Sequence, residues 1–295
     1  MIPLFTSCQE VELRKKKELV LRPEVKSQLT PFLETLARAS EAVLLLDYDG
    51  TVAPFRVERD QAYPYPGVAL LLQGIVRNGR TRVVVISGRN ATDVLPLLGI
   101  HPHPEVWGVH GLQRLKTNGT LEMPRLDERT LNGLSNADRW LGYQQLRRTA
   151  EFKAGSIAVH WRGLSEIDAE NLRSRVLLGW RPIAKDSGLD LLEFDGGIEI
   201  RACEADKGDA VRTFLSEISP NAPAAYLGDD STDESAFRAM QGRGISVLVR
   251  PKRRQTVAQF WLQPPDELID FLGLWLKACI EYDASNGSAA AAVSG

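Results

Sequence analysis

Asp47 and Asp49, two carboxylates two residues apart, are the first residues of this chain whose types and spacing could perform chemistry. They follow the apolar run 43–46, which is typical of a strand buried on both faces of a parallel sheet. In an extended chain residues i and i+2 project to the same side, so both carboxylates can address one point beyond the strand. That end of the strands is where open α/β sheets place their ligands. On these residues alone, a strand followed by an ordinary Asp-Gly turn is the simpler interpretation.

Polar residues further along the chain change that interpretation, because each ends or follows another predicted strand or opens a predicted helix. They are Ser87, Lys207, Asp229, Asp230 and Asp233. Four or five carboxylates that converge at one sheet edge repel one another, so the sequence predicts a bound cation. Oxygen ligands without histidine or cysteine select a hard ion, which in a cell is Mg²⁺. The lysine and the serine suit the remaining charge and the oxygens of a phosphate group.

This set of residues indicates phosphoryl transfer. A carboxylate that attacks a phosphate dianion meets like-charge repulsion, which Mg²⁺ and Lys207 would offset. The second carboxylate, Asp49, could then protonate the leaving alcohol and later deprotonate water.

The elements that must position these residues alternate between strand and helix on either side of an insertion. We expect strands at 43–46, 82–86, 105–109, 223–227 and 244–249, and helices at about 67–77, from 207 onward, at 232–240 and at 266–281. This alternation predicts a parallel, right-handed α/β sheet. A capping-box pattern, Ser231 with Glu234, places Asp229 and Asp230 between a strand end and a helix N-terminus.

The middle of the chain has a different pattern, which predicts an inserted α+β cap. Two helical stretches accompany the predicted strands 156–161, 190–194 and 198–201. The predicted divisions are an N-terminal helical extension at 1–39, a core at 40–111 and 204–283, a cap at 112–203, and a disordered tail at 284–295.

Four segments, in this order along the chain, resemble motifs I to IV of the haloacid-dehalogenase-like phosphatases. They are Asp47-Tyr48-Asp49-Gly50-Thr51, Ser87-Gly88-Arg89, Lys207-Gly208 and Gly228-Asp229-Asp230-Ser231-Thr232-Asp233-Glu234. The first and last, around an inserted cap, are similar to the trehalose-6-phosphate phosphatase family in particular. Further segments that resemble this family are His110-Gly111, Glu151-Phe152-Lys153, His160-Trp161-Arg162 and Ile198-Glu199-Ile200-Arg201. The similarity covers about residues 40–275 and implies a Rossmannoid core, and motifs I and IV together are highly specific.

The resemblance implies a role for each carboxylate. Asp47 would be the nucleophile that forms an aspartyl-phosphate. Asp49 would be the general acid and base, and its backbone carbonyl would also meet Mg²⁺. Asp229 would bind Mg²⁺ directly, whereas Asp230 and Asp233 would act through water or through the motif III lysine.

The resemblance also implies which residues bind the substrate. The phosphate oxygens would be held by Ser87, Lys207 and backbone N–H groups near Gly50 and Gly88. The candidate substrate-binding residues are Arg89, His110, Glu151, Lys153 and Glu199, of which the last three would point from the cap at sugar hydroxyls. Alternatives stay open: Arg89 and His110 could make core contacts, and the cap residues could be ordinary charges on a strand face. Gln113, where the family often has a carboxylate, is expected near the sugar side.

Composition excludes several classes of partner. A formal net charge of −2 over 295 residues argues against nucleic acid or an anionic membrane. Three widely separated cysteines make neither a disulfide framework nor a zinc site, which favours a reducing cytosol. No stretch approaches membrane-spanning length. We therefore expect a cytoplasmic protein that acts on a small sugar phosphate, and any trehalose-6-phosphate synthase would be a separate chain.

Three functions compete. The leading one is a Mg²⁺-dependent phosphatase that hydrolyses trehalose 6-phosphate to trehalose and phosphate. A phosphatase of another glycosyl phosphate, such as glucosylglycerol phosphate or a mannosyl-phosphoglycerate, would share motifs I to IV and differ only in the cap. A non-catalytic domain that binds sugar phosphate is disfavoured, because both carboxylates of motif I and every charged residue of motifs III and IV are present.

Overall fold

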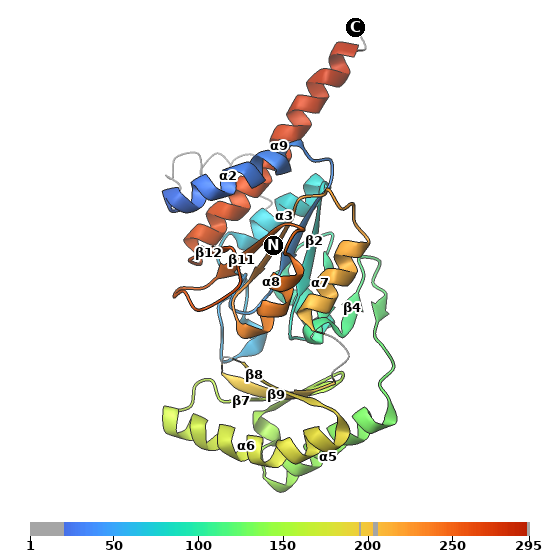
Figure 1. Ribbon diagram of the computed structural model, residues 1–295, viewed down its shortest axis with the longest axis vertical. Helices are drawn as coiled ribbons and strands as arrows, with labels where there is room; N and C mark the ends of the chain where they lie inside the picture. Colours follow the sequence, from blue (N-terminus) through green and yellow to red (C-terminus); the bar gives the residue numbers. More distant parts are fainter. Residues whose placement is uncertain (1–20, 195, 203–205, 294–295) are drawn as a thin grey trace, which may run out of the picture.

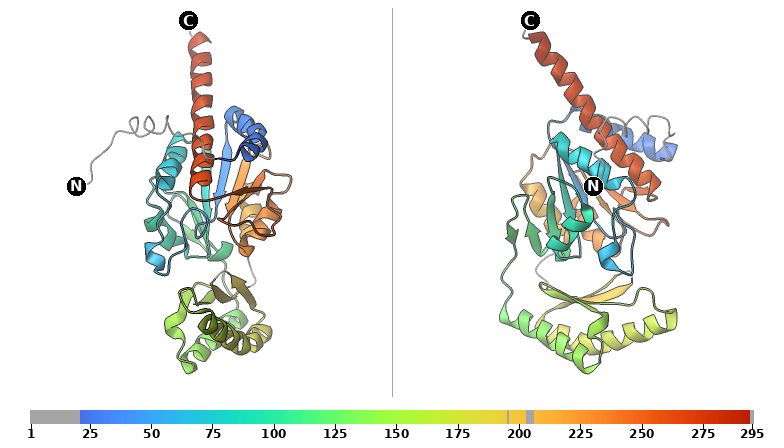
Figure 2. Two further views of the ribbon diagram at one scale, coloured as in Figure 1. Left: turned by 90° about the vertical axis from the view of Figure 1, so that its left-hand side faces the viewer. Right: turned by 180° about the vertical axis from the view of Figure 1, so that it is seen from behind.

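The chain folds into two stacked parts, a core and a cap, each built around its own β-sheet (Figures 1 and 2). The structure, a computed structural model, describes residues 21–194, 196–202 and 206–293, with side chains as far as 282. The cap is an insertion, because strands of the core sheet precede and follow it in the sequence. This arrangement confirms the predicted α/β fold with an inserted α+β cap.

The core sheet has eight strands in the order β12-β11-β10-β1-β2-β3-β4-β5. Its parallel strands are β1 (Ala42–Leu46), β2 (Thr81–Ile86), β3 (Glu105–Gly108), β10 (Ala224–Gly228), β11 (Ile245–Val249) and β12 (Phe260–Leu262). At the end of β1, Leu46 is in register with Leu227 of β10 and Val85 of β2. The residues that follow these three strands therefore lie side by side at one edge of the sheet.

Helices cover both faces of the core sheet. One face packs on α2 (Pro23–Arg38), α3 (Val68–Asn78), α4 (Ala91–Leu98) and α9 (Asp266–Val293), and the other on α7 (Lys207–Ser216) and α8 (Glu234–Ala239). Because side chains alternate along a strand, Leu44 and Leu46 enter the first cluster while Val43 and Leu45 enter the second. Burial on both faces holds β1 rigidly and so fixes the residues directly after it.

The cap places two helices over an antiparallel sheet of order β6-β7-β9-β8. Its elements are α5 (Glu128–Tyr143), β6 (Ala150–Lys153), β7 (Ser156–His160), α6 (Glu166–Ser187), β8 (Asp190–Phe194) and β9 (Gly197–Arg201). Ile157 and Val159 of β7 pack with the helices, which lie on the outer side of the cap in Figure 1. The alternate residues, with Glu199 of β9 in register with Ala158, face the core.

The boundary predicted at residue 112 needs a correction. β4 (Gln113–Leu115) and β5 (Leu121–Glu122) lie within the predicted cap, yet they extend the core sheet: β4 pairs antiparallel with β3, and β5 pairs antiparallel with β4. Strands of three and two residues are too short to show a hydrophobic period. The other limits of extension, core and cap remain predictions.

The structure describes most of the C-terminal segment, as a helix, but not the first 20 residues. Helix α9 continues to Val293, which corrects the predicted disordered tail at 284–295 as far as residue 293. The alanines at 289–292 explain this, because alanine has the strongest helix propensity. Residues 294–295 and 1–20, which include the first half of the predicted helical extension, lie outside the described residues. None of the described helices combines the length and apolarity needed to cross a membrane.

Candidate active site

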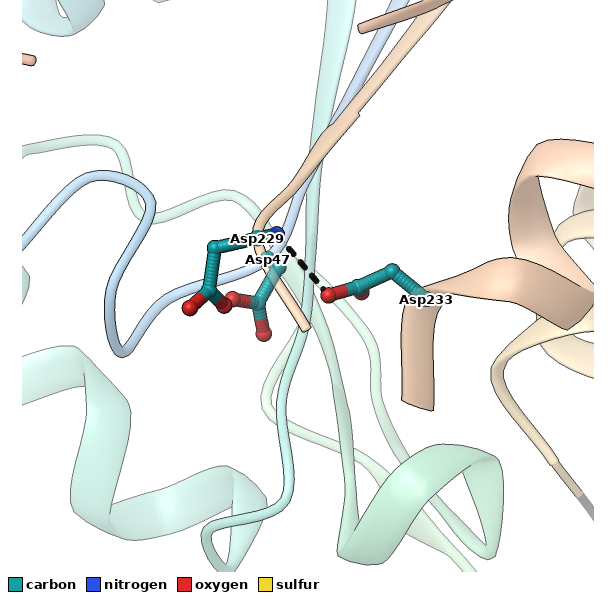
Figure 3. A group of neighbouring side chains, drawn as sticks. All are labelled: Asp47, Asp229 and Asp233. Atoms are coloured by element: carbon teal, nitrogen blue, oxygen red, sulfur yellow. Dashed lines mark hydrogen bonds between the residues drawn. The ribbon is translucent and has the colours of Figure 1, made fainter. Parts of the chain in front are cut away.

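Three buried carboxylates converge at the edge of the core sheet (Figure 3). Asp47 directly follows β1, Asp229 directly follows β10, and Asp233 lies in the short helix η5 (Ser231–Asp233). Each offers an oxygen within 4.8 Å of the other two. The pairing of β1 with β10 fixes this approach, since the Asp47 N–H donates to the Leu227 carbonyl over 2.8 Å.

Asp233 holds the site together and is not left free to bind a ligand. Its Oδ1 accepts from Lys207 Nζ over 2.8 Å and from the Tyr226 hydroxyl over 2.5 Å. Its Oδ2 accepts from the N–H groups of Asp229 and Asp230 over 2.9 and 3.0 Å. Burial opposes its ionisation, but Lys207 and these hydrogen bonds outweigh it and lower the pKa of Asp233. Four donors on two oxygens leave Asp47 and Asp229 as the carboxylates available to a cation.

Asp47 is oriented by two buried donors. Lys207 Nζ donates to its Oδ1 over 2.7 Å, and Thr51 Oγ1 donates to its Oδ2 over 2.9 Å. Burial and the neighbouring carboxylates outweigh the lysine and raise the pKa of Asp47 to about 7. Burial and the charges of Asp47 and Asp233 raise the pKa of Asp229 well above its usual range.

These two carboxylates suit a hard divalent cation. Their oxygens are buried at the same point and repel each other, and an ion between them would keep both ionised. No thiol or imidazole takes part in this acidic cluster of the described chain, so its donor set matches Mg²⁺ rather than zinc.

Two glycines leave space beside these carboxylates. Gly50 has φ of +85°, and a Cβ there would collide with the Asp229 carboxylate and with Phe55. A Cβ on Gly88 would lie 2.7 Å from His110 Nε2. Ser87 is fully buried behind Gly88, where its Oγ accepts from the Arg89 N–H over 3.1 Å. Such close backbone approach is what a phosphate cradle requires.

Asp49 forms a two-point salt bridge with Arg89. Arg89 Nε and Nη2 donate to its two oxygens over 2.7 and 2.6 Å, and Arg89 Nη1 donates to the Arg59 carbonyl over 2.7 Å. Although burial opposes it, the pairing with Asp49 raises the pKa of Arg89. In the structure Arg89 thus forms a salt bridge with the candidate general acid, and its contact with substrate stays a prediction.

His110 and Glu199 connect the core to the cap. His110 lies in η3 (Val109–Gly111) with φ of 56°, and its Nε2 is 3.0 Å from Glu199 Oε2. The other Glu199 oxygen accepts from Lys153 Nζ over 2.6 Å and from Ser156 Oγ over 2.7 Å. Burial lowers the pKa of His110, whereas Lys153 and His110 overcome burial and lower that of Glu199. This contact holds the cap sheet against the core in the structure.

A cavity of about 380 Å³ lies between the core and the cap. The predicted site residues that line it are Asp47, Asp49, Gly88, Arg89, His110, Glu151, Lys153, Lys207, Asp229 and Asp230. Ser87, Asp233 and Glu199 are buried behind this lining, where they bind residues that belong to it. The volume suits a small molecule, and polar groups surround it from both parts of the protein.

Some residues of the site have no predicted role in the sequence analysis. Arg59 and His160 line the cavity, and Thr51 and Tyr226 hold the carboxylates. Thr51 and His160 lie in segments that resemble the family, so the sequence could have indicated a role for them. Arg59 lies in a loop that resembles no family motif, so the sequence contains no such indication for it. Gln113 corrects an expectation, because its Oε1 accepts from the Ala91 N–H over 2.9 Å at the start of α4, away from the sugar side.

Comparison with known proteins agrees with this geometry. A family model described as Trehalose-phosphatase matches residues 45–265. The chain belongs to the trehalose-phosphatase family. A trehalose-phosphate phosphatase of Mycobacterium ulcerans is 28% identical over 271 residues, which cover 84% of this chain and 66% of that protein. An uncharacterized glycosyl hydrolase of Mycobacterium tuberculosis is 28% identical over 270 residues, which cover 85% of this chain but 20% of that protein.

The trehalose-phosphatase fold also appears in a solved structure. The C-terminal domain of a Candida albicans trehalose-6-phosphate phosphatase superposes with a TM-score of 0.73 at 17% identity, and covers 89% of this chain and 99% of that one. At this identity the likeness concerns the fold alone. The chain spans about two thirds of the length of the Mycobacterium ulcerans protein and about a fifth of that of the Mycobacterium tuberculosis protein.

Proposed function

We propose that this chain is a Mg²⁺-dependent phosphatase that hydrolyses trehalose 6-phosphate to trehalose and phosphate. The observation that carries the proposal is the cavity in which Asp47, Lys207 and Asp229 of the core face Glu151 and Lys153 of the cap. The core side suits phosphoryl transfer and the cap side suits hydroxyl groups, so the cavity fits a phosphate joined to a sugar. We further propose that the protein is cytoplasmic and that a separate synthase supplies its substrate.

The residues perform the reaction in two steps. Asp47 attacks the phosphorus and forms an aspartyl-phosphate, while the bond from phosphorus to the sugar oxygen breaks and Asp49 gives that oxygen a proton. Water then attacks the phosphorus, Asp49 takes its proton, and Asp47 and inorganic phosphate are released. Lys207 donates one hydrogen bond to Asp47 and one to Asp233, which holds Asp47 in place and leaves a third N–H to offer a phosphate oxygen.

A metal prediction follows from the acidic cluster. Mg²⁺ held by Asp47 and Asp229, with the Asp49 carbonyl, would supply positive charge next to the phosphate. We expect exhaustive chelation to abolish phosphate release and added Mg²⁺ to restore it. Asp229→Asn should raise the Mg²⁺ concentration needed for half-maximal rate by about tenfold or more, since it removes a charged ligand. Undiminished turnover in protein shown to be metal-free would contradict this.

The cap tests the choice of substrate. Glu151→Gln and Lys153→Met, at the cavity lining, should each lower kcat/KM for trehalose 6-phosphate by about ten- to a hundredfold, because a charged hydrogen bond contributes roughly 1.5–3 kcal/mol. Glu199 is fully buried against Lys153 and His110, so it would support these residues and would not reach a sugar hydroxyl itself. A small aryl phosphate barely reaches these residues, so its kcat/KM should change much less. Phosphate release from both substrates by the wild type and the variants measures this. Equal losses of kcat/KM on the two substrates would mean that these residues support folding or the closure of the cap and do not bind the sugar.

A second candidate is the phosphatase of a different glycosyl phosphate with an additional acidic group. It is favoured by Arg56 and Arg148, exposed residues that line the cavity and make no ion pair within the part of the chain that the structure describes. A mannosyl-phosphoglycerate carries a carboxylate that could meet them. A panel of glycosyl phosphates, compared by kcat/KM with the wild type, decides between the two candidates.

A further inference from the structure

Arg59 contacts the cap directly and the candidate general acid, Asp49, through Arg89, and no motif gives it a role. It lies in the short helix η2 (Arg59–Gln61), in the loop that follows β1. Its guanidinium pairs with the carboxylate of Glu151 on β6 and lies 3.2 Å from Nε2 of His160 on β7. Its side chain thus bridges the core to two strands of the cap.

The backbone of Arg59 contacts the core, on the side of Asp49. The Arg59 carbonyl accepts from Arg89 Nη1 over 2.7 Å. Two other nitrogens of Arg89, Nε and Nη2, donate to the two oxygens of Asp49. A continuous set of contacts therefore runs from Glu151 in the cap, through Arg59 and Arg89, to the carboxylate that must deliver the proton.

The charges along this path agree with the contacts. Burial and the nearby Arg89 lower the pKa of Arg59 to about 10, so it stays a cation at neutral pH. Burial and the charge of Arg59 lower the pKa of His160 to about 3, which leaves a neutral imidazole beside the guanidinium. The Glu151 carboxylate is 3.1 Å from His160 Nε2 and 3.8 Å from Lys153 Nζ, so three groups of the cap and core compete for it.

We propose that Arg59 is a positioning residue that couples occupation of the sugar end of the cavity to the placement of Asp49. The inference rests on the proposed function, because it requires a glycosyl phosphate that reaches Glu151. A sugar hydroxyl that donates to Glu151 competes with Arg59 for the same carboxylate. Displacement of Arg59 moves the carbonyl that anchors Arg89; Asp49, released from Arg89, takes up a proton from solvent and turns toward the leaving oxygen, to which it gives that proton. A substrate too small to reach Glu151 leaves these contacts unchanged.

The effect should therefore appear in kcat and depend on the substrate. Arg59→Ala keeps the backbone carbonyl that anchors Arg89 but removes the side chain through which the sugar acts. We expect kcat for trehalose 6-phosphate to fall about ten- to a hundredfold with KM changed less than about threefold. For 4-nitrophenyl phosphate both constants should stay within about threefold of the wild type. Arg59→Lys keeps the charge without the planar fork and should recover part of the lost kcat.

Asp60→Ala provides a matched control, because Asp60 is the exposed neighbour of Arg59 in η2. It should leave kcat on both substrates unchanged, and thermal unfolding should show that all three variants are folded. Equal losses on the two substrates, a loss confined to KM, or the same loss in Asp60→Ala would overturn the role of Arg59. If the wild type does not hydrolyse trehalose 6-phosphate, the choice of substrate in the proposed function fails, and the same comparison with its best glycosyl phosphate still tests Arg59.

Discussion

Asp47→Asn should reduce phosphate release to background, a loss of at least about 10⁴-fold in kcat, on trehalose 6-phosphate and on an aryl phosphate alike. The amide has the shape of the carboxylate: its one oxygen can still accept from Lys207, and its N–H group can donate to the Thr51 hydroxyl in place of accepting from it. It lacks the negative charge and the nucleophilic oxygen that an aspartyl-phosphate requires. Initial rates of phosphate release, with a detection limit set by a protein-free blank, measure the loss.

Asp49→Asn is the informative comparison for this variant. It keeps the nucleophile and removes the proton carrier, so an activated ester, whose leaving group needs no proton, should still phosphorylate the protein slowly. Mass spectrometry of peptides should locate the trapped phosphate on Asp47. Near-normal turnover in Asp47→Asn, or phosphate on a different residue, would contradict the covalent mechanism.

The chemistry of the core could be predicted because it depends on strand ends. Asp47 and Asp229 follow β1 and β10, two strands whose apolar runs are visible in the sequence. Parallel pairing then forces their side chains together, whatever the loops do. The placement of Lys207 at the start of α7 follows from the same alternation of strand and helix.

Details that depend on competition among similar groups could not be predicted. The pattern Ser231 with Glu234 indicates a capping box, but Asp230 and Asp233 form it, and Glu234 binds Arg254 instead. Ser231 with Glu234 and Asp230 with Asp233 both have the residue types and spacing of a capping box. The positions of Lys207 and of the neighbouring strands decide which pair forms it. Pattern alone cannot rank such alternatives.

The cap shows the same limit at a larger scale. The sequence predicts an α+β insert, but β6 contains Glu151 and Lys153 in a four-residue strand whose polar residues hide its period. The contact of Glu151 with Arg59 joins residues 92 positions apart across two parts of the protein. Long-range contacts between charged side chains leave no local signature, so the coupling of cap and core became visible only in the structure.

Lys207→Met should abolish activity and also destabilise the fold. Its side chain is 3% exposed and its ammonium holds Asp47 and Asp233, so its loss leaves buried carboxylates without their cation. Breaking a buried ion pair on one side costs about 3–5 kcal/mol in the free energy of unfolding, and kcat should fall about 10³-fold or more because no ammonium then meets the phosphate. Urea unfolding and phosphate release measure the two effects. Lys185→Met, on the exposed surface of α6, is the matched control and should change neither. Wild-type stability in Lys207→Met would mean that water or ions replace the lysine, and a kcat within tenfold of the wild type would remove it from the reaction.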